Sequence, residues 1–270
     1  MLHKCYNLGG CVIFAMLTAC AAPDITAPLR MVPSHVLRNT ILIDGAPTMV
    51  LNTYGTTPLV RIYLEGDGSA FTPTGQPSGN PTPRNPIALQ LMQADTSGAS
   101  LHYIGRPCQW VSLPHPSCTP ARWTTQRFTP ELLAAYTAHV RQLSAGRPTE
   151  LICFSGGAWF AENIATQLPN VVGVRAVAGN LNPNLINAHH GVPRIPVAEA
   201  VQGAPKPLLY YSGQKDKVIP PKLVAGMLES RPCAQQITLP EATHTKGWEE
   251  VWRAQGQAAL PNCVPSPQNP

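Results

Sequence analysis

Residues 151–161 read Leu-Ile-Cys-Phe-Ser-Gly-Gly-Ala-Trp-Phe-Ala and predict a strand, a sharp turn and a helix. The apolar run stops at Ser155, and the two glycines that follow it let the backbone reverse without Cβ collisions. Small and apolar residues then recur at helical spacing at Ala158, Ala161 and Ile164. The serine therefore stands at the apex of a tight turn between a buried strand and a helix.

A serine in such a turn, here called the elbow, suits nucleophilic chemistry. A hydroxyl is a poor nucleophile at neutral pH, so it needs a base to take its proton and an N–H that binds the substrate oxygen. Ser155 and the N–H of Gly156 have the right places for nucleophile and donor. The sequence departs from the usual G-x-S-x-G, because Cys153 replaces the first glycine while Gly157 keeps the second. Taken alone, a Ser-Gly-Gly turn is more often a plain loop.

The N-terminus predicts export and attachment to a lipid. The apolar stretch at 8–17 is shorter than the about 20 residues that span a bilayer, and it is typical of a secretory signal. It closes on Leu-Thr-Ala-Cys at 17–20, which resembles a bacterial lipobox, so we expect a lipid such as palmitate on Cys20. Ala21 rather than Asp follows the cysteine, and in lipoproteins of this type that favours the outer membrane. An ordinary signal peptide with a chance cysteine is the alternative.

We expect four parts in the chain: a lipoprotein signal peptide at 1–19, a tether at 20–39, an α/β domain at 40–260 and a Pro-rich C-terminal tail at 261–270. About 250 residues remain after the leader, enough for one domain with a sizeable core. The formal net charge is +5 and the basic residues are scattered, so a nucleic-acid partner is disfavoured. The expected partners are a small-molecule or acylated substrate and a membrane surface reached through the lipid.

Cysteine usage also fits an oxidising compartment. Outside the leader the cysteines are Cys108, Cys118, Cys153, Cys233 and Cys263. We pair Cys108 with Cys118 and Cys233 with Cys263, because each pair brackets a Pro-rich loop segment and each bond contributes roughly 2–4 kcal/mol. Cys153 is then expected to stay free, buried and unreactive. No C-x-x-C or H-x-x-x-H spacing occurs, so a zinc site is disfavoured.

The rest of the chain alternates strands with helices, which argues for a mostly parallel sheet with helices on both faces. The first two strands, at 41–43 and 48–52, read as an antiparallel pair joined at Asp44-Gly45. Further strands are expected at 59–64, 100–104, 150–154, 172–178, 207–211 and 236–239, and helices at 85–93, 130–143, 158–168, 221–228 and 246–255.

The loops after two later strands carry the groups that an elbow serine needs. Asp216 follows the strand at 207–211, and His244 follows the strand at 236–239. A lone Asp in a Gly-containing turn is usually structural, and a lone loop histidine is more often merely solvated. Here the order Ser, Asp, His, each at the carboxyl end of a strand, favours a catalytic set. His244 would take the proton of Ser155, and Asp216 would orient the imidazole.

A second donor for the substrate oxygen is expected in the loop Glu-Gly-Asp-Gly at 65–68. Glycines on both sides let the N–H of Asp67 approach the substrate and join that of Gly156 in an oxyanion hole. A simple tight turn is the alternative interpretation. His189 and His190 have no carboxylate at metal spacing, and we expect Trp248 and Trp252 in the core.

Five segments together resemble the α/β-hydrolase superfamily, specifically the serine-hydrolase-type lipoproteins of Gram-negative bacteria. They lie at 63–68, 154–157, 178–182, 212–220 and 242–244. The resemblance implies the α/β-hydrolase fold, a triad of Ser155, Asp216 and His244, and hydrolysis of an ester, thioester or amide without a cofactor or metal. We expect a carboxylic ester hydrolase at the cell envelope, facing the periplasm. No long apolar insertion precedes Asp216, which favours a small cap over a modest pocket.

Two other functions stay open at this point. One is an envelope binding or scaffold lipoprotein that keeps the fold but has a degenerate elbow. The other is a serine aminopeptidase or acyltransferase, which would use the same three side chains.

Overall fold

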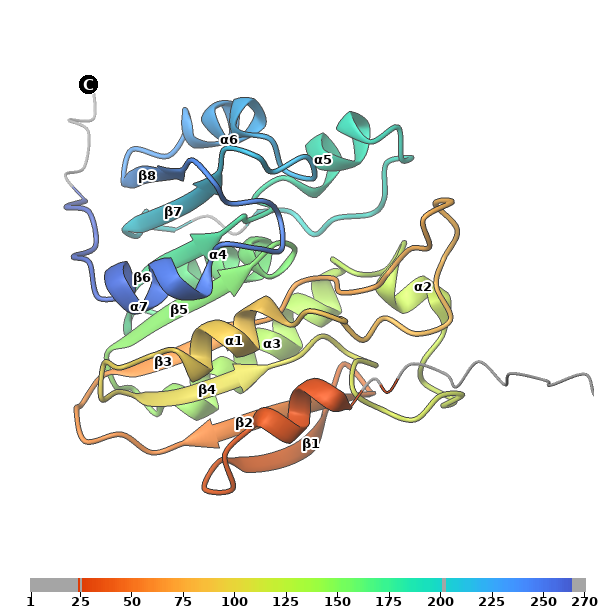
Figure 1. Cartoon of the computed structure of the whole chain (residues 1–270), viewed down its shortest axis with the longest axis horizontal. Coiled ribbons are helices and arrows are strands. Elements are labelled where there is room, and N and C mark those ends of the chain that lie inside the picture. The colour runs from red at the N-terminus through yellow and green to blue at the C-terminus, as the bar shows by residue number, and fades with distance from the viewer. Residues whose placement is uncertain (1–23, 25, 201–202, 264–270) are drawn as a thin grey trace, which may run out of the picture.

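The computed structural model describes residues 24, 26–200 and 203–263, and in this part eight strands form one sheet (Figure 1). The strands are β1 (Leu37–Ile43), β2 (Ala46–Thr53), β3 (Val60–Leu64), β4 (Ser100–Ile104), β5 (Thr149–Phe154), β6 (Val171–Val177), β7 (Leu208–Gly213) and β8 (Ala234–Leu239). Their order across the sheet is β1-β2-β4-β3-β5-β6-β7-β8. β2 is antiparallel to both of its neighbours, and the pairs from β4 to β8 are parallel. The mostly parallel sheet that the sequence predicts is therefore confirmed.

Helices cover both faces of the sheet, as the sequence predicts. They are α1 (Ile87–Gln93), α2 (Pro120–Trp123), α3 (Pro130–Ser144), α4 (Gly157–Gln167), α5 (Pro183–His189), α6 (Pro221–Leu228) and α7 (Glu249–Gln255), with the 3-10 helix η1 (Ala27–Met31) before β1. Figure 1 shows α1 and α7 in front of the sheet and α3 and α4 behind it. One apolar cluster joins α3, α4 and α6 to the sheet, and a second joins α1, α7 and η1 to the opposite face.

Local sequence signals explain where the elements begin. The Asp44-Gly45 turn has positive φ at both residues, +49° and +71°, which is the geometry of a tight hairpin between β1 and β2. Helix α3 begins after Thr129, whose side chain accepts a hydrogen bond from the N–H of Leu132, and a proline occupies its first turn. Both are local signals that can be read from the sequence.

The short helices α2 and α5 go beyond the prediction. Each begins at a proline inside a segment that reads as a Pro-containing loop. The side chain of Asn182 caps α5 by accepting a hydrogen bond from the N–H of Leu185. A single turn of this kind lacks a long apolar period, so sequence periodicity does not reveal it.

The covalent and aromatic expectations agree with the structure. Disulfides join Cys108 to Cys118 and Cys233 to Cys263, while Cys153 is a free, fully buried thiol. Trp248 and Trp252 are both 3% exposed and belong to the core on the α1 and α7 face. In the described part of the chain, no helix has the length and apolar character needed to cross a bilayer. Cys20 and the leader lie outside the described residues.

Candidate active site

The elbow places Ser155 at the point where β5 ends and α4 begins. Ser155 has φ +47°, a left-handed conformation that is costly for a residue with a side chain and is common at functional turns. The following two glycines leave little room for a side chain. A Cβ on Gly157 would lie 2.6 Å from the carbonyl oxygen of Leu64, and a Cβ on Gly156 would lie 2.2 Å from Asp67 Oδ1. The turn therefore packs tightly against the loop that follows β3.

A continuous hydrogen-bond chain connects the three polar residues that the sequence singles out. Ser155 Oγ lies 3.1 Å from His244 Nε2, and His244 Nδ1 lies 2.9 Å from Asp216 Oδ2. The carboxylate accepts a hydrogen bond from the Nδ1–H, which leaves Nε2 free to accept a hydrogen bond from the serine hydroxyl. Segments that are 89 residues apart in the chain meet here.

Asp216 is fixed by the backbone around it. It is 3% exposed, and its Oδ1 accepts hydrogen bonds from the N–H groups of Val218 at 2.7 Å and Ile219 at 2.9 Å. The loops after β7 and β8 are tied together by a hydrogen bond from the Lys215 N–H to the carbonyl oxygen of Ala242 at 3.0 Å. These contacts hold the carboxylate at the depth and angle that the imidazole requires.

His244 is supported by two aromatic side chains. Its ring centroid lies 5.0 Å from that of Phe154, and its carbonyl oxygen accepts a hydrogen bond from Trp248 Nε1 at 2.9 Å. The side chain of His244 is 14% exposed, whereas the side chain of Asp216 is fully buried. The imidazole thus lies between a buried carboxylate and a hydroxyl that borders open space.

That open space is a cavity of about 810 Å³ that contains Ser155 and His244 in its wall. The loop after β3 forms one side of the cavity, and α5 with the residues after it forms another. Asp67, Asn180 and Ile219 are also part of the lining. Two further cavities in the described residues, each of about 440 Å³, are lined by none of the three residues of the hydrogen-bond chain.

The loop at 65–68 is held by a buried carboxylate. Glu65 is 1% exposed, and it accepts hydrogen bonds from the N–H of Gly66 at 3.0 Å, the N–H of Ala88 at 3.5 Å and the hydroxyl of Tyr103 at 3.2 Å. Burial raises the pKa of Glu65 to about 7, although the hydrogen bonds oppose the shift. On the other side of the loop, Gln109 Nε2 donates to the carbonyl oxygen of Gly66 at 3.0 Å.

Sequence reasoning missed the charged groups behind this loop. The carboxylate of Asp67, of which only the N–H was considered, forms ion pairs with Arg127 at 3.1 Å and Arg106 at 3.6 Å. Neither arginine has a spacing relative to Ser155 or His244 that signals its position. The Thr-Gln-Arg-Phe run before α3 reads as an ordinary loop. Only the tertiary structure brings Arg127 to the wall of the cavity.

Cys153 and His190, the other reactive residue types near the site, are not part of the hydrogen-bond series from Asp216 to Ser155. Burial raises the pKa of the Cys153 thiol well above its usual value, so the thiolate is disfavoured. His190 lines the cavity, and its Nε2 lies 2.8 Å from the carbonyl oxygen of Val218. Among the described residues, no three His, Cys, Asp or Glu side chains are grouped as metal ligands.

Comparison with known proteins supports the fold. No protein-family model matches the sequence, and no curated protein sequence matches it. Among solved structures, an α/β serine hydrolase homologue from Coxiella burnetii is 17% identical, with a TM-score of 0.56 over 81% of this chain and 96% of that one. A Xanthomonas campestris protein, a member of the α/β serine hydrolases without lid, is 16% identical, with a TM-score of 0.55 over 86% of this chain and 98% of that one.

A third structure, a proline iminopeptidase-related protein from Thermus thermophilus, is 16% identical, with a TM-score of 0.53 over 81% of this chain and 96% of that one. The strand order, the helices on both faces and these similarities agree. The chain has the α/β-hydrolase fold, as its sequence predicts. This fold hosts many activities, so the function must be argued from the site.

Proposed function

We propose that this protein is a cofactor-free serine hydrolase that cleaves carboxylic esters through an acyl-enzyme. The observation that carries the proposal is the chain of hydrogen bonds from Asp216 through His244 to Ser155, which ends on a cavity of about 810 Å³. A merely solvated histidine needs neither contact, and a histidine that is only ion-paired needs no contact with a strained serine. Base, nucleophile and substrate space are present together.

In the proposed first step, His244 Nε2 takes the hydroxyl proton of Ser155 as the serine oxygen attacks the ester carbonyl carbon. The negative oxygen that forms is bound by the N–H groups of Gly156 and Asp67. When the tetrahedral intermediate collapses, the imidazolium gives its proton to the leaving alcohol. Asp216 stabilises the imidazolium and keeps its proton on Nδ1.

In the second step, a water molecule replaces the alcohol and His244 takes its proton. The hydroxide attacks the acyl-enzyme carbonyl, and collapse returns the proton from His244 to Ser155 Oγ while the carboxylic acid leaves. The same histidine thus acts as base and acid in each half of the cycle. No further group is required for the atoms and protons to balance.

The cell envelope is the proposed location. The lipobox-like sequence at 17–20 supports a lipid anchor at Cys20 in the outer membrane, facing the periplasm, and the two disulfides fit an oxidising compartment. The test is fractionation of cells that express the full chain. Metabolic labelling with a palmitate analogue and recovery in the membrane fraction should both be lost in Cys20→Ala. Unchanged membrane recovery would contradict the anchor.

Activity-based labelling tests the catalytic proposal directly. The mature protein should react with a fluorophosphonate probe and hydrolyse short p-nitrophenyl esters, and Ser155→Ala should abolish both while keeping the thermal transition. Ser69→Ala is the matched control, because Ser69 lines the same cavity but its hydroxyl is outside the hydrogen-bond chain. It should remain labelled.

The outcomes separate the competing functions. Folded wild-type protein that neither reacts with the probe nor turns over esters would contradict the hydrolase proposal and favour a binding or scaffold role. Faster turnover of peptide amides than of matched esters would favour an aminopeptidase. Transfer of the acyl group to an added alcohol in preference to water would favour an acyltransferase.

A further inference from the structure

The carboxylate of Asp67 lies directly beside the elbow. The position that a Cβ on Gly156 would take is 2.2 Å from Asp67 Oδ1 and 2.9 Å from Asp67 Oδ2. The Asp67 side chain is 22% exposed and shares the cavity wall with Ser155. A bare negative charge at this place would repel an oxyanion that forms at the N–H of Gly156, because the reduced dielectric of the site strengthens the repulsion.

Two arginine side chains approach that carboxylate from the protein side. Arg127 Nε lies 3.1 Å from Asp67 Oδ2, and Arg106 Nη2 lies 3.6 Å from Asp67 Oδ1. Their side chains are only 5% and 7% exposed. Two cations against one carboxylate leave this set, the Asp67–arginine cluster, with an excess of positive charge next to the elbow.

Both guanidinium groups are held in place by other contacts. Arg127 donates through Nη2 to Asn187 Oδ1 at 2.9 Å and through Nη1 to the carbonyl oxygen of Thr124 at 2.5 Å. Arg106 donates through Nη2 to the carbonyl oxygen of Arg127 at 2.5 Å. These bonds use backbone or neutral acceptors, so they orient the arginines without cancelling their charge.

Aromatic rings complete the support of Arg106. Its guanidinium carbon lies 4.3 Å from the ring centroid of Phe160 and 5.3 Å from that of Phe128. Contacts of this kind favour the charged form of a buried guanidinium. Keeping two like charges close together and buried is costly, and a plain ion pair with Asp67 would need only one of them.

We propose that Arg106 and Arg127 are positioning residues for the oxyanion hole. They hold Asp67, whose N–H is the proposed second oxyanion donor, and they convert its carboxylate from a repulsive charge into part of a net positive cluster. The inference rests on the proposed hydrolase function and adds to it two residues that act through Asp67 rather than on the reacting atoms. Their effect is on kcat, since the charge that they compensate matters most when the oxyanion forms.

A double-mutant cycle between Arg127 and Asp67 tests this role. Arg127→Gln should lower kcat for a neutral p-nitrophenyl ester roughly 10- to 100-fold with little change in KM, because it removes the excess positive charge and leaves Asp67 with only the longer contact to Arg106 at 3.6 Å. That is less than the 10²–10³-fold cost of deleting a direct oxyanion donor. Adding Asp67→Asn to Arg127→Gln should recover at least about fivefold in kcat, because the negative charge beside the forming oxyanion is removed and the cation of Arg106 remains.

A purely structural ion pair predicts the opposite result for the double variant. If the pair only held the loop, removal of both partners would leave kcat as low as in Arg127→Gln or lower, and that result would overturn the role. An inactive wild-type protein would instead contradict the proposed hydrolase function itself. The rate of fluorophosphonate labelling and the thermal transition are measured for each variant, so changes in folding are separated from changes in reactivity.

Further variants control for charge, for the segment and for folding. Arg127→Lys retains a cation and should keep kcat within about tenfold of the wild type, above the value for Arg127→Gln. Arg122→Gln is the control for loss of an arginine from the same segment, because Arg122 pairs with Asp44 at 2.7 Å rather than with Asp67; its kcat should not change. If Arg127→Gln does not fold, Arg106→Gln with and without Asp67→Asn gives the same cycle at the longer contact.

Discussion

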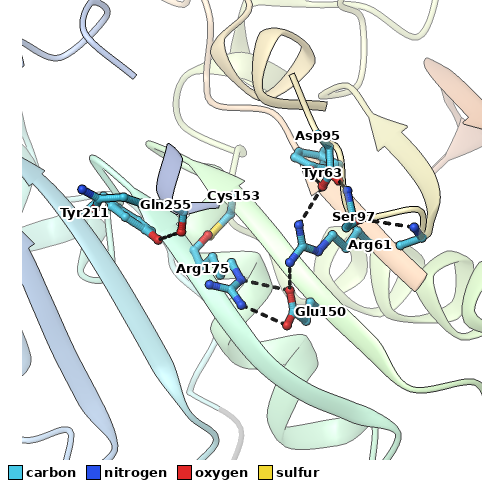
Figure 2. Close-up of polar contacts among 10 residues, drawn as sticks. Arg61, Tyr63, Asp95, Ser97, Glu150, Cys153, Arg175, Tyr211 and Gln255 are labelled. Carbon is cyan, nitrogen blue, oxygen red and sulfur yellow. Dashed lines mark hydrogen bonds and ion pairs between the residues drawn. The ribbon is translucent and has the colours of Figure 1, made fainter. Parts of the chain in front are cut away.

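Two buried polar clusters lie along β5, and they differ in composition and in access to open space. Glu150, near the start of the strand, belongs to an ion network with Arg61 and Arg175 (Figure 2). Ser155, just after the end of the strand, begins the hydrogen-bond chain with His244. Both clusters place charged or titratable groups away from water, so burial alone does not distinguish a catalytic site from a structural one.

The difference lies in how completely each cluster is paired and closed. In the ion network, Arg61 contacts Asp95 at 2.8 Å and Glu150 at 2.9 Å, and Arg175 contacts Glu150 at 2.9 Å. Two arginines face two carboxylates, and all four side chains are at most 9% exposed. Tyr63 adds a hydrogen bond to Asp95. Such a network holds β3, β5 and β6 and the segment after α1 together.

The series of hydrogen bonds from Asp216 to Ser155, at the other end of β5, is open to the cavity at Ser155. Asp216 is as buried as the network, but each step toward Ser155 brings the groups closer to the cavity of about 810 Å³. A buried carboxylate that is linked through an imidazole to an accessible hydroxyl can support the transfer of a proton from that hydroxyl. The comparison therefore predicts that substitutions at the two clusters separate activity from stability.

The largest expected effect is on catalysis. Asp216→Asn should lower kcat about 10⁴-fold, because an amide no longer keeps the His244 proton on Nδ1 or stabilises the imidazolium. The measurement is steady-state hydrolysis of a p-nitrophenyl ester together with thermal unfolding. The thermal transition should change far less than it does for the substitution in the ion network. A variant that keeps near-wild-type turnover would remove Asp216 from the mechanism.

The ion network should show the reverse behaviour. Glu150→Ala leaves Arg61 and Arg175 buried without their shared carboxylate, so we expect a loss of about 3–5 kcal/mol in the free energy of unfolding. The kcat of the protein that remains folded should stay within about twofold. Glu162→Ala is the control, since it removes one ion pair, with Arg231, whose side chains are 23% and 28% exposed, and it leaves a single, partly solvated arginine without a partner; its loss should be smaller. Equal losses for the two variants would contradict a special role for the network.

The two clusters also differ in how far the sequence reveals them. Ser155, Asp216 and His244 follow strands, and parallel strands deliver their carboxyl ends to one edge of a sheet, so their meeting is predictable. Glu150, Arg61 and Arg175 stand inside strands, where the pattern predicts apolar neighbours. Their pairing depends on which strands are adjacent and in what register, and the chain order alone does not state that.

The same limit applies close to the site. The Glu-Gly-Asp-Gly loop was predicted from its glycines, but the roles of its two acidic side chains were not. Glu65 meets Tyr103 and the start of α1, and Asp67 meets Arg127, from segments 23 to 60 residues away. Turn chemistry is local and can be read along the chain, whereas the partners of a buried charge are set by tertiary packing.

Glu65 shares a feature with each cluster. It borders the cavity that contains Ser155, and it is buried like the ion network. Its pKa in the folded protein is about 7, against an ordinary value of 4.5, because burial disfavours the carboxylate. Protonated Glu65 thus stabilises the fold fully below pH 4.5, and this contribution is lost as the pH rises toward 7. The loss amounts to at most about 3 kcal/mol.

A comparison of wild type with Glu65→Gln isolates this effect. Burial lowers the pKa of His102 to about 4, so His102 makes stability rise with pH over much of the same range and masks Glu65 in the wild type alone. Chemical denaturation from pH 4 to pH 8 should show the stability of Glu65→Gln increasing relative to wild type between pH 4.5 and 7 and then levelling. A constant difference would mean that the pKa of Glu65 is the same in the folded and unfolded states.

The smallest expected effect is that of a substitution at Cys153. This residue lies on β5 between Glu150 of the ion network and Ser155. It is fully buried, its thiol contacts the carbonyl oxygen of Arg175 at 3.4 Å, and its side chain faces the α3 and α4 side of the sheet while Glu150 faces the other. Cys153→Ala should therefore cost only about 1 kcal/mol of stability and leave kcat within about twofold.

The reactivity of the Cys153 thiol gives a second measurement. Since burial raises the pKa of Cys153, the native wild type should resist a maleimide under conditions that label it after denaturation. Inactivation of the native enzyme by the reagent, absent in Cys153→Ala, would show instead that the thiol reaches the active site. The departure from G-x-S-x-G would then be functional; with the expected result, cysteine is a tolerated small residue under a helix whose close approach is set by Gly157.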